Sequence, residues 1–248
     1  MKAFAAAPST VLLLMCLQGC MASSTSLTAH EAFALSASAL SGIDRYEIEG
    51  QVFILGPGGY VFDKAGYEGK VIGHGNLKLQ WRALSVQPAS VKEQAITSYR
   101  PLQLLEIIND RSAVITYAET PKSNQMVHFK IKLDDRIARE RAAGGLRAEM
   151  KLLRSESGLL KRDPVEANKV LSRAEKRLEE ALATLKVTTT CAWTANPQDW
   201  LPRQLKEETV LSYTWNAKAF KEERVSETNF HLHAQDDTIK RSKGHLGG

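Results

Sequence analysis

This sequence lacks two features, and each absence excludes a class of function. No run of apolar residues reaches the length of about 20 that a membrane-spanning helix needs. No basic patch with interleaved aromatic residues occurs either, because Lys and Arg alternate with Asp and Glu along the chain and aromatic residues make up only 7% of it. Despite a formal charge of +5, we therefore expect no nucleic-acid partner. A solvated surface beside anionic lipid or wall polymer explains this charge better.

Motifs of catalytic and cofactor sites are missing as well. The sequence contains no Gly-x-Ser-x-Gly elbow, no Ser-x-x-Lys and no Ser/His/Asp spacing. The glycine-rich stretch Gly56–Gly59 lacks the Gly-Lys-Ser/Thr ending of a phosphate loop, so it predicts a turn. We expect a protein without enzymatic activity and without a cofactor. A hydrolase with a site assembled from distant residues is the least favoured alternative.

The one marked apolar run, LLLMCLQGC at Leu12–Cys20, is too short to span a membrane and is followed by the polar MASSTS. This arrangement indicates an export signal. Its last four residues, Leu17-Gln18-Gly19-Cys20, resemble the lipobox of bacterial lipoproteins. The resemblance implies cleavage before Cys20 and lipidation of that cysteine, with acyl chains of the palmitate kind. An ordinary secretory signal cut elsewhere, for example after Ala22, is the alternative.

The lipobox reading sets the expected organisation of the chain. Residues 1–19 form a signal peptide, 20–27 a lipidated tether, 28–234 a single domain and 235–248 a flexible tail. We expect the mature protein to be exported and held by its lipid anchor on the outer face of the cell membrane, or in an outer membrane if the organism has one. Cys191 is then the only cysteine of the domain, which favours a small buried apolar residue over a reactive thiol.

Period-two and helical patterns predict an α+β fold with an antiparallel sheet. Thr28 and Glu31 predict a capped helix that ends at Gly42. A strand is expected directly after it, one long strand over Gly69–Leu84, two short helices between Pro88 and Asn109, a hairpin over 112–133 and a three-strand meander over 186–233. In the long strand, Gly73 and Gly75 are expected either to permit a bend in the sheet or to leave room beneath it.

Residues 134–186 have a helical period and predict an insertion between the strands. Asp163 and Pro164 predict the start of its second helix. The apolar stripe expected on that helix comprises Val170, Ala174, Leu178, Ala181, Leu182 and Leu185. Gly144-Gly145 weakens the first helix, which is expected to break there.

Both ends of the domain resemble the LolA/LprG-like lipoproteins and lipoprotein carriers. The helix leading into SGIDRYEIEGQVFIL is similar to the opening of that class, and NPQDWLPRQLKEETVLSYTW followed by KEERVSETNFHL is similar to its closing meander. The resemblance implies a curved antiparallel half-barrel covered by helices, with an apolar concave face that accepts acyl chains. The helical insertion over 134–186 departs from the family pattern.

This resemblance leads to the functional hypothesis of a membrane-anchored protein that binds a lipid, an acyl chain or an envelope partner. A ligand tunnel would be lined by the apolar faces of two strands. The candidate ligand-facing residues are Val71, Leu77, Leu79, Trp81, Val127, Phe129 and Ile131. The alternative is an envelope sensor or structural lipoprotein that acts as an interaction module, with these faces packed solid and an apolar patch exposed elsewhere.

Two groups of titratable residues could in principle form chemical sites. His231 and His233, with His128 or His74, could converge on zinc, but no ligand spacing fixes that geometry and we expect no metal site. The four carboxylates Glu207, Glu208, Glu222 and Glu223 could pair for acid/base work. Their alternation with lysine and arginine instead predicts cross-strand ion pairs on the solvent face of the sheet.

Overall fold

The computed structural model describes residues 27–56, 58–73, 76–83, 99–100, 102–109, 113–156 and 163–232. The signal peptide, Cys20, the helix expected at 91–98, His74, His233 and the tail over 235–248 lie outside these ranges.

Eight antiparallel strands form one open sheet in the described part of the chain, in the order β3-β2-β1-β8-β7-β6-β5-β4. Pairing of β1 with β8 joins the N-terminal strands to the C-terminal meander at the middle of the sheet. The strands are β1 (Arg45–Leu55), β2 (Val61–Ile72), β3 (Asn76–Ala83), β4 (Ala113–Tyr117), β5 (Val127–Leu133), β6 (Lys186–Ala195), β7 (Pro202–Trp215) and β8 (Lys218–His231).

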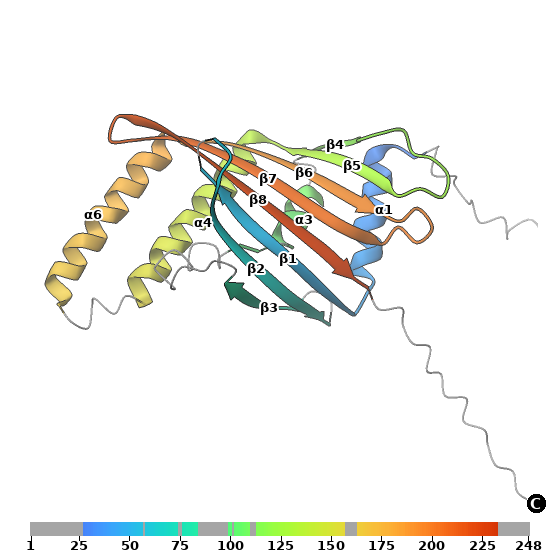
Figure 1. Ribbon diagram of the computed structural model, residues 1–248, viewed down its shortest axis with the longest axis horizontal. Helices are drawn as coiled ribbons and strands as arrows, with labels where there is room; N and C mark the ends of the chain where they lie inside the picture. The colour runs from blue at the N-terminus through green and yellow to red at the C-terminus, as the bar shows by residue number, and fades with distance from the viewer. Residues whose placement is uncertain are drawn as a thin grey trace, which may run out of the picture.

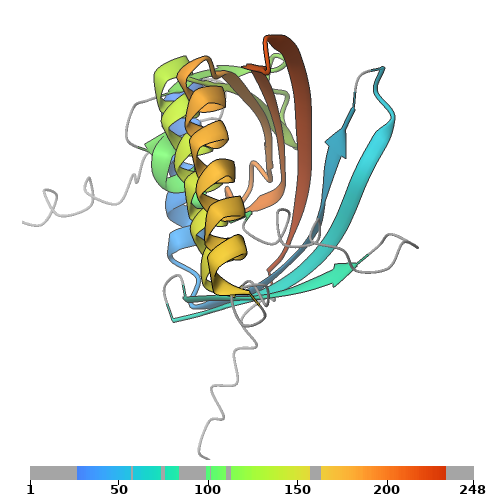
Figure 2. The ribbon, with the colours of Figure 1, turned by 90° about the vertical axis from the view of Figure 1, so that its left-hand side faces the viewer.

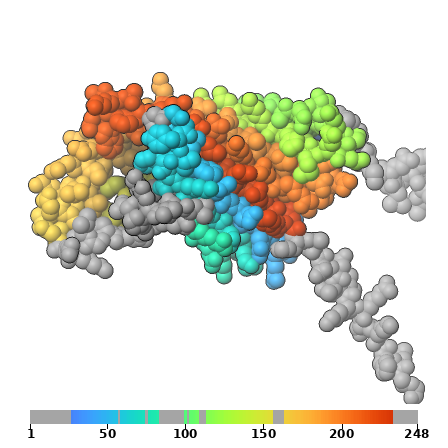
Figure 3. Space-filling model, viewed as in Figure 1, coloured from blue at the N-terminus to red at the C-terminus, as the bar shows by residue number. Residues whose placement is uncertain are grey.

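Four helices of the described residues lie on the concave side of this curved sheet (Figures 1 and 2). They are α1 (Ala29–Ser41), α3 (Gln103–Asn109), α4 (Asp135–Glu156) and α6 (Pro164–Ala183). In the space-filling view, taken from the same side as Figure 1, the outer face of the sheet faces the viewer and α6 lies at the left (Figure 3). The expected α+β fold with a curved antiparallel sheet is therefore confirmed at this level.

Local sequence signals account for how the helices begin. The expected capping box of α1 is present, with the Thr28 hydroxyl accepting from the Glu31 backbone and the Glu31 carboxylate accepting from the Thr28 backbone. Asp163 accepts from the Glu166 N–H at the start of α6, with Pro164 in the first turn as expected. Asp134 accepts from the first backbone N–H groups of α4. Each cap satisfies donors that have no partner inside the helix.

The core lies between the helices and the concave face of the sheet, and α1 contributes the aromatic contacts over β5 and β6. The ring of Phe33 meets the rings of Phe129 and Trp193 edge-on, at centroid distances of 6.1 and 5.5 Å. The indole N–H of Trp193 donates to the Ser36 hydroxyl at 2.8 Å, so a buried polar group of each element has a partner. These contacts fix α1 against β5 and β6.

A glycine of β1 allows a side chain of β2 to lie across β1 and reach β8. A side chain at Gly50 would collide with the ring of Tyr67 and with the Glu227 carbonyl oxygen. Tyr67, on β2, therefore passes over β1 and its hydroxyl lies 2.5 Å from the Thr228 hydroxyl on β8. Gly50 is thus the position where close approach of another residue requires the absence of a Cβ.

The single strand expected over Gly69–Leu84 is wrong. β2 ends at Ile72, Gly73 adopts a positive φ of 59°, and β3 returns antiparallel from Asn76. Val71 pairs with Leu77, so both side chains still face the core side. The residue numbers of Val71 and Leu77 differ by an even number. The period-two pattern of the first strand therefore continues into the second, and the two strands look like one in the sequence. Gly73 therefore lies at the start of a reversal between two strands, whereas Gly75 lies outside the described residues.

Two expectations for the helical insertion are also wrong. α4 is continuous through Gly144-Gly145, so the glycine pair does not break it. On α6, Val170 is exposed, and Ala167 and Leu171 are the buried residues of its first half. The second half of the expected stripe is correct, since Ala181, Leu182 and Leu185 are buried.

Contacts between α4 and α6 join the two helices. The Arg139 guanidinium donates to the carbonyl oxygens of Leu182 and Leu185 at 3.0 and 2.9 Å, which satisfies acceptors at the C-terminal end of α6. Arg147 makes a two-bond ion pair with Glu179 at 2.7 and 2.8 Å. These interactions hold α4 and α6 together. The other face of α4 packs on the concave face of the sheet.

Candidate functional site

A pocket of about 120 Å³ lies between the inward face of α4 and the concave face of the sheet. A single buried water needs about 10–15 Å³ of such space, so the pocket can hold a group of several heavy atoms. Its lining comprises Val52, Ile54, Tyr99, Arg100, Gln103, Ala138, Arg141, Ala142, Gly145, Leu146, Glu149, Thr189, Glu207, Thr209, Leu211, Arg224, Val225 and Ser226.

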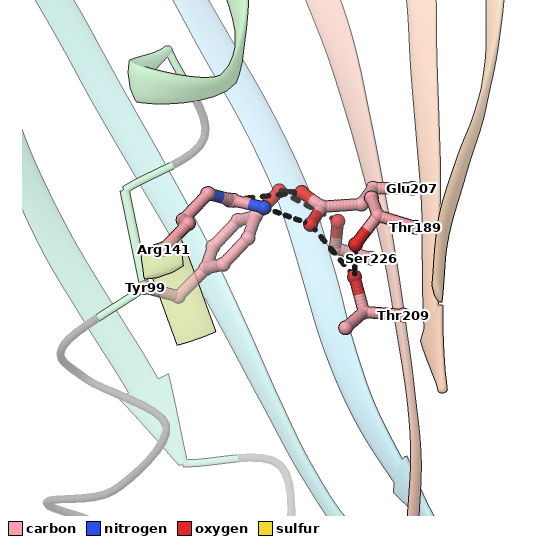
Figure 4. Close-up of polar contacts among 6 residues, drawn as sticks. All are labelled: Tyr99, Arg141, Thr189, Glu207, Thr209 and Ser226. Atoms are coloured by element: carbon pink, nitrogen blue, oxygen red, sulfur yellow. Dashed lines mark hydrogen bonds and ion pairs between the residues drawn. The ribbon is translucent and has the colours of Figure 1, made fainter. Parts of the chain in front are cut away.

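An ion pair between helix and sheet forms the polar part of this pocket (Figure 4). Arg141 Nη1 lies 2.5 Å from Glu207 Oε1 and Nη2 lies 3.3 Å from Oε2. Both side chains are largely buried, with exposed fractions of 16% for Arg141 and 6% for Glu207. A buried pair of opposite charges with two hydrogen bonds is a specific link between α4 and β7.

Hydroxyl groups surround the carboxylate of this pair. The Tyr99 hydroxyl donates to Glu207 Oε2 at 3.1 Å, and the Thr209 hydroxyl donates to Oε1 at 3.1 Å. Tyr99 also lies 2.6 Å from the Ser226 hydroxyl, and Thr189 lies 2.9 Å from Thr209 (Figure 4). The network therefore connects α4, the segment at Tyr99 and three neighbouring strands.

The periods of the strand and the helix explain how these two charges meet. Glu207 shares the inward face of β7 with Leu205, Thr209 and Leu211, all buried. Arg141 lies on the α4 face that also carries Ala138 and Leu146. Residues three and four apart share one helix face and alternate residues share one sheet face, so both side chains are directed between the two layers.

The burial of this network shows in the pKa values of its members. Burial lowers the pKa of Arg141, but the charge and the hydrogen bonds of Glu207 outweigh that effect and leave the pKa above its ordinary value. Burial, with the negative charge of Glu207, raises the pKa of Tyr99 well above its ordinary value. Arg141 therefore stays charged and Tyr99 stays a neutral donor at physiological pH.

Apolar side chains form the remaining walls of the pocket. Val52 and Ile54 come from β1, Leu211 from β7, and Ala142 and Leu146 from α4. The site therefore combines a short apolar surface with a buried ion pair and a few other polar side chains. Concave sites of this composition, with few polar groups among apolar walls, are typical of small-molecule binding.

The seven sequence-predicted ligand-facing residues lie elsewhere. Val71, Val127, Phe129 and Ile131 are buried in the core, and Leu77, Leu79 and Trp81 are half-buried against it. None of them is among the residues that line the pocket beneath α4. Ligand contact at these positions stays a prediction.

The expectation for Glu207 needs a correction. It does not lie on the solvent face of the sheet and does not make a cross-strand ion pair, since it is buried and bound to Arg141 of α4. Glu222 pairs with Arg224 of its own strand, at 2.5 Å between Oε1 and Nε. Leu205 and Leu211 alternate with the same period as Glu207, so an inward face for these two leucines predicts that Glu207 also lies inside. No sequence signal pointed to Arg141 as its partner.

The histidines that the structure describes do not converge. His231 lies 3.1 Å from Glu49 of β1, and His128 lies 3.1 Å from the Thr194 hydroxyl. They are on β8 and β5, three strand spacings apart, which is roughly 14 Å. Within the described residues no group of three His, Cys, Asp or Glu side chains is arranged to hold a metal ion.

Cys191 is buried beside this network, where it pairs in register with Glu207. Burial, with the charge of Glu207, raises the pKa of the Cys191 thiol far above its ordinary value. The thiolate needed for a reactive cysteine is therefore disfavoured.

None of the described helices combines the length and the apolar character needed to cross a membrane.

Comparisons with known proteins give only distant similarities. No protein-family model matches the chain, and no curated protein matches it. Among solved structures, a LolA superfamily protein from Nitrosomonas europaea is 8% identical, with 86% of this chain and 97% of that chain covered and a TM-score of 0.23. The tesB protein of Mycobacterium avium subspecies paratuberculosis is 10% identical, with 82% and 85% covered and a TM-score of 0.16. Similarity at this level does not establish a shared fold.

Proposed function

We propose that this protein is an exported, lipid-anchored binding protein that takes an apolar or amphipathic ligand in the pocket beneath α4 and carries out no catalysis. The pocket between α4 and the concave face of the sheet is the observation that carries this proposal. Its apolar walls favour burial of a hydrocarbon segment, because removal of apolar surface from water is favourable. The lipobox-like Leu17–Cys20 supports the anchor.

The size of the pocket sets a condition on the ligand. Ligand pockets for drug-sized molecules usually enclose about 300–1,000 Å³, and this one encloses about 120 Å³. A complete acyl chain is therefore too large for the pocket as it stands. Either α4 moves away from the sheet, or part of the chain extends out of the pocket opening. Displacement of α4 would separate Arg141 from Glu207, so ligand uptake and the buried ion pair are coupled in this proposal.

A pair of glycines on α4 provides a matched test. Gly145 lines the pocket, Gly144 is not among its described lining residues, and a Cβ added at either position meets no atom within 4 Å. Both positions have helical backbone, where replacement of glycine by leucine gains about 1 kcal/mol of helix propensity. Gly145→Leu therefore fills the pocket while Gly144→Leu makes the same chemical change outside it.

The probe is N-phenyl-1-naphthylamine, an uncharged dye whose fluorescence rises in apolar surroundings. We expect saturable binding to the wild-type protein and to Gly144→Leu, and weak or no binding to Gly145→Leu. Absence of saturable binding to the wild type, or equal binding to both variants, would remove the pocket as a ligand site.

A second candidate function, a protein-interaction module, is favoured by a different observation. Tyr60, Val61 and Phe62 are consecutive residues at the start of β2, and each is more than half exposed, at 56%, 54% and 53%. An exposed run of large apolar side chains marks interaction sites more often than chance. A photo-crosslinking amino acid at Phe62, with one at the buried Tyr46 as control, tests it in intact cells. Crosslinking to one defined protein at Phe62 alone supports this function.

A further inference from the structure

The carboxylate of Glu207 has no capacity for a further donor. A carboxylate offers about four lone-pair sites. Arg141 Nη1, Arg141 Nη2, the Tyr99 hydroxyl and the Thr209 hydroxyl supply four donors to its two oxygens. A cationic ligand group would have to displace one of these donors before it reached Glu207.

Arginine donors in the same pocket are in excess. A guanidinium has five N–H donors. Among the described residues, Arg141 donates only to Glu207, through one bond from each of two nitrogens. Arg224 also lines the pocket and donates from Nε to Glu222. It lies two residues along β8 from Ser226, which is roughly 7 Å at the rise of a strand. The part of the pocket around Glu207 therefore offers N–H groups of Arg141 and Arg224, and the Glu207 carboxylate itself has no oxygen lone pair left for a further donor.

We propose that the ligand is an anionic amphiphile whose carboxylate or phosphate oxygens accept from Arg141 and Arg224. Its hydrocarbon part lies against Val52, Ile54 and Leu146 on the neighbouring walls. Planar guanidinium groups match both kinds of oxyanion through paired N–H bonds. This inference rests on the proposed ligand-binding function and specifies the chemical class that the same pocket selects.

Four ligands with the same eight-carbon chain test the head group. Octanoate and octyl phosphate are anionic, octan-1-ol is neutral and octylammonium is cationic. Each is used to displace N-phenyl-1-naphthylamine from the purified full-length protein. We expect both anions to bind about tenfold or more tightly than octan-1-ol, since a hydrogen bond between charged partners is stronger than a neutral one, and octylammonium to bind least. The ratio between the two anions tells a fatty-acid-like head from a phospholipid-like one.

Variants can separate the contribution of Arg141 to head-group selectivity from its contribution to folding stability. Arg141→Gln combined with Glu207→Gln removes both charges and keeps two hydrogen-bonding amides at the same positions, so no unpaired charge remains buried. We expect this double variant to lose the preference for octanoate over octan-1-ol, measured as the ratio of the two affinities and therefore independent of any change in its affinity for the dye. Arg147→Gln, on the same helix and outside this pocket, is the matched control and keeps the preference.

The outcomes are distinguishable from failure of the binding function itself. Equal affinity of octanoate and octan-1-ol for the wild type, or an anion preference that survives in the double variant, overturns the head-group assignment alone. If the dye does not bind the wild type, or no member of the series displaces it, both the assignment and the ligand-binding function fall.

Discussion

Replacement of Arg141 by methionine tests whether the ion pair with Glu207 is as buried as the structure indicates. The variant keeps a long apolar side chain at the position and leaves the carboxylate, only 6% exposed, with the hydroxyls of Tyr99 and Thr209 as its donors. Loss of one partner of a buried pair costs about 3–5 kcal/mol.

The double variant Arg141→Met with Glu207→Leu completes the cycle. It removes both charges and replaces them by apolar side chains, so we expect its stability to lie within about 1 kcal/mol of the wild type or above it. Urea titrations followed by tryptophan fluorescence measure the free energy of unfolding of the wild type, Arg141→Met, Glu207→Leu and the double variant. A loss below about 1 kcal/mol in Arg141→Met, or additive losses in the double variant, would refute the buried pair.

Three further predictions concern the frame around the site and the anchor. Gly50→Ala brings a Cβ into the Tyr67 ring and lowers the free energy of unfolding by about 1–3 kcal/mol in urea titrations, whereas an unchanged value would contradict the close approach. Burial raises the pKa of Tyr46 to about 12, so the folded protein keeps a proton that the unfolded chain loses above pH 10. Stability therefore falls by roughly 2 kcal/mol between pH 10 and 12, and Tyr46→Phe removes that share of the fall in a pH series of urea titrations. Parallel curves for the two proteins would count against it. Cys20→Ser abolishes acylation, and intact-mass measurement of the protein from native membranes detects the loss of the acyl mass. If the variant and the wild type carry the same added mass, lipidation at this residue is excluded.

The elements of the fold were largely predictable because their signals are local. The capping box at Thr28, the Asp163-Pro164 start of α6 and the period-two meander over 186–231 each depend on neighbouring residues, and the structure contains all three. The antiparallel pair of β2 and β3 was missed because the alternation of apolar residues keeps the same phase on both strands, as the pairing of Val71 with Leu77 shows. Continuity of α4 through Gly144-Gly145 was missed because tertiary packing overrides a weak local preference.

The candidate site was not predictable in the same way. Its two charged residues are 66 positions apart, on a helix and a strand whose relative placement no local pattern encodes. The inward phase of β7 was enough to place Glu207 inside the protein, but its partner on α4 emerges only from the packing of α4 on the sheet. Residues chosen from apolar strand faces, such as Phe129 and Ile131, instead form the core.

Native mass spectrometry of the protein purified from its own membrane in mild detergent tests the binding site beneath α4 most directly. Wild type and Gly144→Leu are expected to carry a dissociable adduct with the mass of an anionic amphiphile, while Gly145→Leu, with the pocket filled, carries none. A wild-type protein without an adduct, or an adduct retained equally by Gly145→Leu, would contradict the proposal that this pocket holds the ligand.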